Sequence, residues 1–299
     1  MRWALLIGCW CAWSTCTAVS FVSLRDASDP NNRVAAASDW LIGQLPDSLW
    51  LDSNVQFIQQ PLAHLQVESL EQLQARLAGK RVLVMLHGMA KTLTTAQTDF
   101  FNGLWTWKQA GGEADVEEVL LVSWPGTAQV SIPGYLKANR LASKSGRQFH
   151  ALLDALNAGG CHVDILTHSM GSKVALRALK SGSSCEGLFL MAPSVWKWTI
   201  RPGRKWARGF SQATGMRGVY FSRGDWAFNF TAINKMGLGF NGVSLRKTDR
   251  FEQMDCSAFV NQDVFRALSR SRFRTRSNHS MYWQTQQVFD RVKVLSGHS

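Results

Sequence analysis

Hydrophobic residues in this chain gather in short unbroken runs, and longer stretches of mixed polarity separate these runs. Such a run suits a strand that is buried on both faces of a parallel sheet. The clear runs lie at 81–86, 119–123, 163–167, 188–191 and 219–221, with a weaker one at 243–245 and a short candidate strand at 55–58. Stretches that can form helices lie at 69–77, 141–156 and 172–179. This alternation predicts an α/β fold with a mostly parallel central sheet and helices on both faces.

The N-terminal residues have a different pattern. A single cation precedes an apolar stretch over 3–13, and small residues follow it. These are the marks of a secretory signal peptide, with cleavage predicted after Ala18 or Ser20; an uncleaved anchor and a buried helix are the alternatives. We therefore predict a signal peptide or N-terminal anchor over 1–24, a polar linker over 25–33 and a single domain over 34–299. The protein is then expected to be exported, and to be periplasmic, secreted or membrane-anchored.

The strongest local motif joins the run at 163–167 to the helix predicted after it. His168-Ser169-Met170-Gly171 lies between the two. A sharp strand-to-helix turn of this kind is a nucleophile elbow, which exposes a serine above the sheet. Gly171 meets the demand for a small neighbour, whereas Thr167 stands where the usual motif has its first glycine. An ordinary strand–turn–helix connection with an incidental serine is the alternative.

A serine that attacks an acyl group needs backbone N–H donors for the oxyanion that forms. In an elbow of this kind, one donor is the residue after the serine, here Met170. The second donor comes from the loop after an early strand, and His87-Gly88 follows the run at 81–86. We predict Met89 as this second donor, with Ala90 as the alternative.

The acid and the base are expected later in the chain, in the order serine, acid, histidine. Only His279 and His298 follow the serine, and His298 is the penultimate residue, so His279 is the predicted general base. Asp225 comes after the run at 219–221 and is the predicted acid, with Asp249 and Asp255 as alternatives. Four of the earlier histidines, His87, His150, His162 and His168, are predicted to be structural.

Together these motifs resemble the α/β-hydrolase superfamily, and specifically a mainly bacterial family of it that is catalogued as a domain of unknown function. The resemblance rests on His87-Gly88, 123–126, 168–171 with 177–179, Ala192-Pro193, 222–227 and 278–280, which together span 81–283. It implies an α/β-hydrolase fold with Ser169, Asp225 and His279 as the triad, and it supplies no substrate. The chain departs from the family pattern at Met89-Ala90, where relatives carry an aromatic residue and Asn. It departs again at Lys137-Ala138, where relatives carry an Asp.

Basic residues outnumber acidic ones by 33 to 21, which gives a formal net charge of +12 and favours anionic partners. Cations alternate with tryptophans over 196–208, where α/β-hydrolases place a cap, and a second basic stretch over 266–276 leads to His279. The predicted substrate-entrance residues are Trp196, Trp198, Arg201 and Trp226. We expect a small-molecule or lipid ester as substrate and an anionic membrane surface as partner, with a solvated helical face as the alternative. Because no recognition motif for it occurs, nucleic acid is not expected as a partner.

Three cysteines, Cys161, Cys185 and Cys256, lie outside the predicted leader. No spacing of cysteines and histidines suits a zinc site, so we expect no metal, and we expect no cofactor. The runs at 163–167 and 188–191 are expected to form neighbouring strands about 4.8 Å apart. This would bring Cys161 and Cys185 close enough for a disulfide, with two free thiols as the alternative. Cys256 is predicted to be a free thiol.

These features favour a serine hydrolase that cleaves an ester or thioester through an acyl-enzyme. An acyltransferase would use the same triad with an alcohol in place of water. A non-catalytic envelope-binding module of the same fold and a basic protein that binds nucleic acid are the other function classes. The sequence does not separate a hydrolase from a transferase, and it leaves the oligomeric state open.

Overall fold

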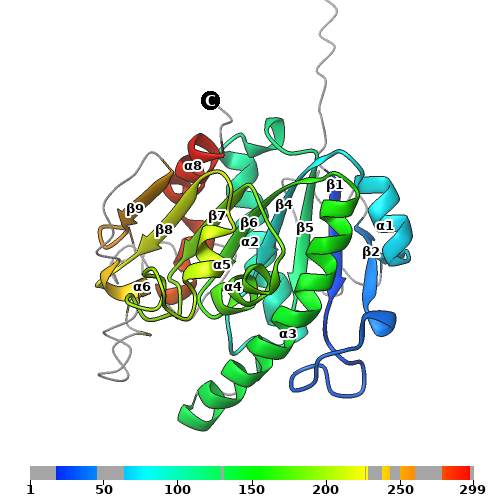
Figure 1. The fold of residues 1–299 in the computed structure, drawn as a ribbon, viewed down its shortest axis with the longest axis horizontal. Helices are drawn as coiled ribbons and strands as arrows, with labels where there is room; N and C mark the ends of the chain where they lie inside the picture. Colours follow the sequence, from blue (N-terminus) through cyan, green and yellow to red (C-terminus); the bar gives the residue numbers. More distant parts are fainter. Residues whose placement is uncertain are drawn as a thin grey trace, which may run out of the picture.

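The computed structural model describes residues 18–45, 64–128, 131–225, 227, 238–242, 250–259 and 278–296. Within these residues the strands form a nine-stranded sheet in the order β3-β2-β1-β5-β4-β6-β7-β8-β9 (Figure 1). The strands are β1 (Ala18–Ser23), β2 (Leu41–Leu45), β3 (Gln66–Val67), β4 (Arg81–Leu86), β5 (Glu118–Ser123), β6 (His162–His168), β7 (Gly187–Met191), β8 (Arg217–Phe221) and β9 (Phe251–Asp255). From β1 to β9 in the sheet, neighbouring strands are parallel, whereas β2 is antiparallel to both β1 and β3.

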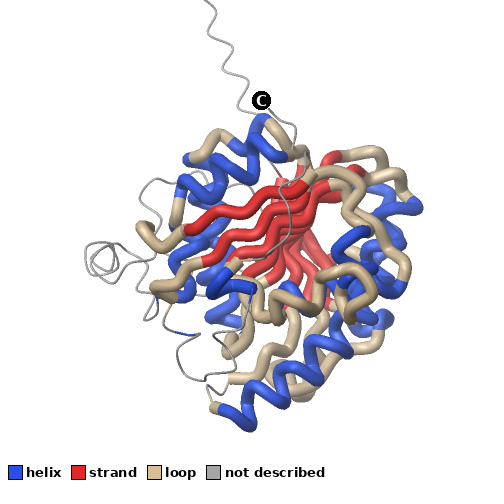
Figure 2. The backbone as a smooth tube through the Cα atoms, turned by 60° about the vertical axis from the view of Figure 1, so that its left-hand side comes forward, coloured by secondary structure: helices blue, strands red, loops and turns tan. Residues whose placement is uncertain are grey.

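Helices connect the strands and cover both faces of the sheet (Figure 2). The α-helices are α1 (Leu70–Leu77), α2 (Leu93–Gln109), α3 (Ile132–Ala158), α4 (Gly171–Ser181), α5 (Ala207–Ser211), α6 (Leu238–Asn241) and α8 (Gln286–Leu295). Short 3-10 helices are η1 (Ala37–Asp39), η4 (Gly112–Ala114) and η7 (Asn278–Gln284). Helices α1, α3, α4 and α5 pack together on one face, and α2, α8 and η7 pack together on the other.

Side chains that alternate along each strand build a core on each face of the sheet. On β4, Val82, Val84 and Leu86 belong to the core beneath α1, α3 and α4. Leu83 and Met85 belong to the core beneath α2 and α8. The unbroken apolar run of β4 therefore reflects burial on both sides, which is typical of a parallel strand between two helical layers.

The predicted α/β fold class, a mostly parallel sheet with helices on both faces, is confirmed. The runs at 81–86, 119–123, 163–167, 188–191 and 219–221 fall in β4, β5, β6, β7 and β8. The helical stretch at 69–77 is α1 with Ser69 as its N-cap, and the other two lie within α3 and α4. The candidate strands at 55–58 and 243–245 lie outside the described residues.

Strand β1 corrects the predicted boundary at residue 24. Residues 18–23 pair with β5 on one side and β2 on the other, and Val19, Phe21 and Val22 are buried. They therefore belong to the sheet of the folded domain. The sequence pattern assigns them to the leader because their apolar character continues that of the stretch at 3–13. Residues 1–17 lie outside the described part of the chain.

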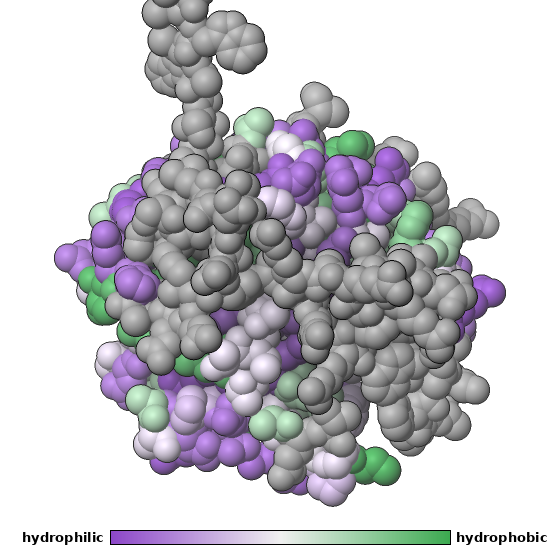
Figure 3. Space-filling view, turned by 180° about the vertical axis from the view of Figure 1, so that it is seen from behind, coloured by the Kyte–Doolittle hydropathy of each residue, from purple (hydrophilic) through white to green (hydrophobic). Residues whose placement is uncertain are grey.

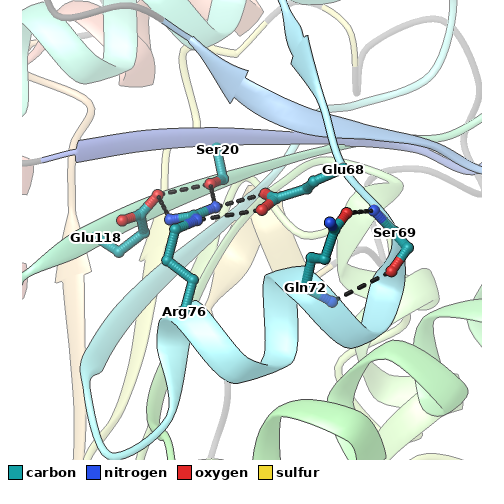
Figure 4. Close-up of polar contacts among 6 residues, drawn as sticks. All are labelled: Ser20, Glu68, Ser69, Gln72, Arg76 and Glu118. Atoms are coloured by element: carbon teal, nitrogen blue, oxygen red, sulfur yellow. Dashed lines mark hydrogen bonds and ion pairs between the residues drawn. The ribbon is translucent and has the colours of Figure 1, made fainter.

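A buried polar network ties β1 to α1 and β5 (Figure 4). The Arg76 guanidinium lies 2.6 Å from a Glu68 carboxylate oxygen and 3.0 Å from one of Glu118. It also donates to the Ser20 hydroxyl oxygen at 2.6 Å, and this hydroxyl donates to Glu118 at 2.6 Å. Because Ser20 and Glu118 are fully buried, each needs such a partner to offset the loss of water. The network therefore holds β1 in its register.

The segment predicted to be a linker, 25–33, is a compact reversal of the chain. Arg25 pairs with Val34 in an antiparallel bridge, and Arg33 lies 3.4 Å from Asp26. Arg25 is also buried, and its side chain contacts the site described below. The linker prediction is therefore wrong, because a polar, turn-rich sequence marks a turn inside a domain as readily as a connection between parts.

The three cysteines of the described chain are free thiols, so the disulfide hypothesis for Cys161 and Cys185 is wrong and the free-thiol alternative holds. The Cys161 thiol donates to the Leu77 carbonyl oxygen at 3.1 Å. The backbone of Cys185 forms an isolated parallel β-bridge with that of Ala213. Burial raises the pKa of the Cys185 and Cys256 thiols, which keeps both of them protonated at neutral pH.

Two further findings concern only the part of the chain that the structure describes. No helix there combines the length and the apolar character that crossing a membrane requires. No cluster of three or more His, Cys, Asp or Glu side chains there could hold a metal ion. Where described residues are visible on the face opposite to that of Figure 1, hydrophobic ones are scattered among hydrophilic ones (Figure 3), as on the surface of most folded domains.

Candidate active site

Ser169 occupies the sharp turn between β6 and α4, at the carboxyl edge of the sheet. Its φ of 51° lies in the left-handed region, which residues other than glycine rarely adopt. The turn is held because Ser169 N–H donates to Met191 O at 2.8 Å and Ser169 O accepts from Ser194 N–H at 3.0 Å. Strand and helix approach so closely that a Cβ on Gly171 would come within 2.6 Å of the His87 carbonyl oxygen. This is the geometry of a nucleophile elbow.

Two backbone segments frame the serine. Met170 is the N-cap residue of α4, so its N–H lies at the positive end of the helix dipole. The loop 87–91 approaches from the other side, and a Cβ on Gly88 would lie 3.1 Å from the serine Cβ. In this loop the Ala90 N–H donates to Gly126 O at 3.0 Å. Because the Ala90 N–H already has a partner, Met89, the first choice from the sequence, stays the predicted oxyanion donor.

The structure brings Asp225 and His279 into contact. His279 Nδ1 lies 2.6 Å from Asp225 Oδ2, and the Asp225 side chain is fully buried. An ionised carboxylate can only accept a hydrogen bond, so Nδ1 carries the proton and Nε2 the lone pair. The second carboxylate oxygen accepts the Ala227 N–H at 3.1 Å, which fixes the orientation of the carboxyl group. The imidazole is thus held in the tautomer that a general base requires.

Asp255, an alternative predicted acid, does not occupy this place. Asp255 Oδ1 accepts hydrogen bonds from the backbone N–H, at 2.9 Å, and from the hydroxyl of Ser257. Asp249 and His298 lie outside the described residues. Of the two carboxylates that can be compared, Asp225 is the one in contact with His279.

His168 links the elbow to His279. It directly precedes Ser169, its Nε2 donates to the His279 carbonyl oxygen at 2.7 Å, and the two imidazole rings lie 4.6 Å apart. Burial lowers the pKa of His168 well below its usual value, a protonated His279 would lower it further, and the charge of Lys91 also lowers it. The ring is therefore neutral. Its Nδ1 lies next to Gly88: a Cβ added to this glycine would come within 2.9 Å of the nitrogen. This is a positioning role, close to the structural one predicted.

Arg25, from the segment predicted to be a linker, holds the loop 87–91. Its guanidinium donates to Ser123 Oγ at 2.7 Å and to Pro30 O at 2.8 Å. The same group donates to Lys91 O at 3.1 Å and to His87 Nε2 at 3.2 Å. Burial lowers the pKa of Arg25 to about 9, so the guanidinium stays charged at neutral pH. Both ends of the loop 87–91 are thereby fixed by one side chain.

The Lys91 side chain anchors the same loop to α2. Its ammonium lies 2.9 Å from Asp99 Oδ1, and Asp99 is almost completely buried. Burial raises the pKa of Asp99, and the nearby Lys91 charge opposes this rise. Sequence reasoning predicts neither this pair nor Arg25. The partners are far apart along the chain, and a single arginine in a polar turn carries no signal of burial.

Three of the predicted entrance residues, Trp196, Trp198 and Arg201, come after β7, whose carboxyl end lies at the same edge of the sheet as Ser169. Trp196 is 41% exposed, and its ring lies 4.7 Å from that of Trp198. Arg201 is exposed, as are Arg204, Lys205 and Arg208. Trp226 lies outside the described residues. That these side chains form an entrance or meet an anionic membrane surface stays a prediction.

Comparisons with known proteins agree with this architecture. A model of the family described as the alpha/beta hydrolase family matches residues 83–294. The match runs from β4 into α8, and it includes Ser169, Asp225 and His279. No curated protein matches the chain.

Proposed function

The chain belongs to the alpha/beta hydrolase family, and from this premise we propose that it is a serine hydrolase of carboxylic esters or thioesters. Membership supports hydrolase chemistry in general, and the substrate class and mechanism are the proposal. The observation that carries it is the 2.6 Å contact between Asp225 and His279, set beside the elbow that holds Ser169. This arrangement has the parts that acyl transfer needs: a hydroxyl, a base of fixed tautomer and nearby backbone donors.

In the first half-reaction, Ser169 Oγ attacks the carbonyl carbon of the ester while His279 Nε2 takes the hydroxyl proton. The buried Asp225 carboxylate stabilises the imidazolium that forms. The N–H groups of Met170 and Met89 donate to the oxyanion of the tetrahedral intermediate. When this intermediate collapses, the alcohol or thiol leaves with the proton from His279, and the acyl group stays bonded to Ser169.

In the second half-reaction, a water molecule attacks the acyl-enzyme. His279 takes a proton from this water, and the same two backbone N–H groups bind the second oxyanion. Collapse of the intermediate breaks the bond to Ser169 Oγ, which recovers its proton from His279. The products are the carboxylic acid and the free enzyme. An acyltransferase would follow the same steps with an alcohol in place of water, and a non-catalytic module would carry out neither half.

Hydrolysis of p-nitrophenyl esters of increasing chain length tests the proposal. We expect the wild-type protein to release p-nitrophenol and Ser169→Ala to lose this activity without loss of folding. Ser181→Ala is the matched control, because Ser181 is exposed at the far end of α4. Full activity of Ser169→Ala would contradict the proposal. Faster product formation when an alcohol is added, with ester as the product, would identify an acyltransferase.

A further inference from the structure

A lysine of α4 lies close to the candidate nucleophile and has an unusual environment. Lys173 is four residues after Ser169, and its Nζ donates to Asn139 Oδ1 at 2.9 Å and to the Tyr135 hydroxyl oxygen at 3.1 Å. The ammonium also lies 4.9 Å from the centre of the Tyr135 ring. Within the described residues, no carboxylate forms an ion pair with Lys173.

This placement is unfavourable for folding in two respects. Burial disfavours the charged ammonium and lowers the pKa of Lys173; the contact with Tyr135 opposes this shift, and the charge of Lys205 adds to it. A cation in the first turn also faces the positive end of the helix dipole, where an anion would be stabilising. Polar contacts with Asn139 and Tyr135 offset part of this cost, but no counter-charge among the described residues does so. Side chains that break such rules are typical of functional sites.

The cluster formed by Lys173, Tyr135 and Asn139 is linked to Ser169 through Ser194. The Tyr135 hydroxyl lies 3.5 Å from Ser194 Oγ, and Ser194 N–H donates to the Ser169 carbonyl oxygen at 3.0 Å. Tyr135 lies near the start of α3, between the exposed Ile132 and Leu136. The cluster therefore lies beside the elbow, and the first turn of α3, which carries Tyr135, also has exposed side chains.

We propose that the Lys173 ammonium and the Tyr135 hydroxyl form a subsite for a carboxylate group of the substrate. An ammonium has three N–H donors, and two of those on Lys173 are used within the protein. The third donor and the Tyr135 O–H offer one charge-assisted hydrogen bond to each carboxylate oxygen. The bound anion would supply the missing counter-charge at the start of α4. This inference rests on the proposed function, and it specifies an ester that also bears a carboxylate.

Two p-nitrophenyl esters of equal carbon number test the subsite: the adipate monoester, which ends in a carboxylate, and the hexanoate. The measured quantity is the ratio of kcat/KM for adipate to that for hexanoate. We expect the wild type to prefer the adipate ester and Lys173→Met to lower the ratio on the order of tenfold or more, as for loss of a hydrogen bond to a charged group. Tyr135→Phe should also lower this ratio. Lys144→Met, which removes an exposed charge from α3, is the control and should leave the ratio unchanged.

A wild type without preference for adipate would overturn the subsite, as would equal loss of the ratio in Lys173→Met and Lys144→Met. Tyr135→Phe provides the answer if Lys173→Met does not fold. Calorimetric binding of adipate to Ser169→Ala separates the subsite from the proposed function. If no ester is hydrolysed, the hydrolase proposal fails, and adipate binding that depends on Lys173 still supports the subsite. Absence of such binding would refute it.

Discussion

At the scale of single residues, two backbone conformations shape the site. Ser169 and Ala90 have φ values of 51° and 58°, in the left-handed region. Each such residue costs on the order of 1–3 kcal/mol and persists only where its surroundings hold it. Hydrogen bonds to Met191 O and Gly126 O hold these two. At Ser169 the left-handed conformation makes the sharp turn from β6 into α4. At Ala90 it accompanies the hydrogen bond that uses the Ala90 N–H.

The role of Asp225 gives a prediction at this scale. Asp225→Asn should lower kcat for ester hydrolysis on the order of 10⁴-fold, because an amide N–H facing His279 Nδ1 favours the wrong tautomer. Steady-state kinetics on a p-nitrophenyl ester measure the effect. Asp255→Asn is the matched control, since Asp255 bonds Ser257 instead. A near-normal rate for Asp225→Asn, or a large loss in the control, would move the acid elsewhere.

Sequence reasoning reached some site residues and not others for a physical reason. Asp225 and His279 follow from chain order, because the fold fixes which strand ends meet at the site. The choice between Met89 and Ala90 depends on which N–H already has a partner, and this is a property of the folded backbone. Arg25 is found only in the structure, because its contacts with the loop 87–91 join segments that are distant in sequence.

At the scale of elements, buried parallel strands are the most predictable part of this chain, since their apolar runs are unbroken. Helix α2 has no such signal. Its buried residues include Gln97, Asp99, Asn102 and Thr106, so no clear apolar stripe marks it. Strand β1 has an apolar run, but the run continues the apolar stretch of the predicted leader. In both cases the tertiary contacts decide, and a local pattern does not contain them.

Strand β1 gives a prediction about truncation. Deletion of residues 1–24 should unfold or strongly destabilise the protein, because it removes Val19, Phe21 and Val22 from the core. At about 1.5–3 kcal/mol each, these side chains account for much of the roughly 5–15 kcal/mol that stabilises a domain. Deletion of residues 1–17 is the control, since it leaves β1 intact. Equal urea midpoints for the two variants would show that β1 is dispensable.

At the scale of the whole molecule, the sheet assembles the site from distant segments. Arg25 follows β1, the loop 87–91 follows β4, and the elbow at Ser169 follows β6. Asp225 comes after β8, and η7 brings His279 to it. Because the carboxyl ends of parallel strands share one edge, residues far apart in sequence converge there. The net positive charge of the chain predicts a preference for anionic partners. It does not show which residues would bind them.

Two buried neutral histidines give a prediction about pH. Burial lowers the pKa of His87 and of His168 well below the ordinary value of 6.5. Below pH 6.5 the unfolded chain therefore binds more protons than the folded one, and stability falls as the pH falls. Each histidine changes the free energy of unfolding by up to about 1.4 kcal/mol per pH unit. Urea unfolding at pH 7.5 and 5.5 measures this; equal or greater stability at pH 5.5 would contradict it.

The central claim is that Ser169 is the nucleophile of an acyl-transfer reaction, and covalent labelling tests it most directly. The folded protein is treated with an alkyl fluorophosphonate, and the adduct is located by mass spectrometry of the digested chain. We predict one phosphonate adduct, on the peptide that contains Ser169, and none in Ser169→Ala or in protein unfolded before treatment. An unlabelled wild-type protein, or an adduct on a different serine, would contradict the account.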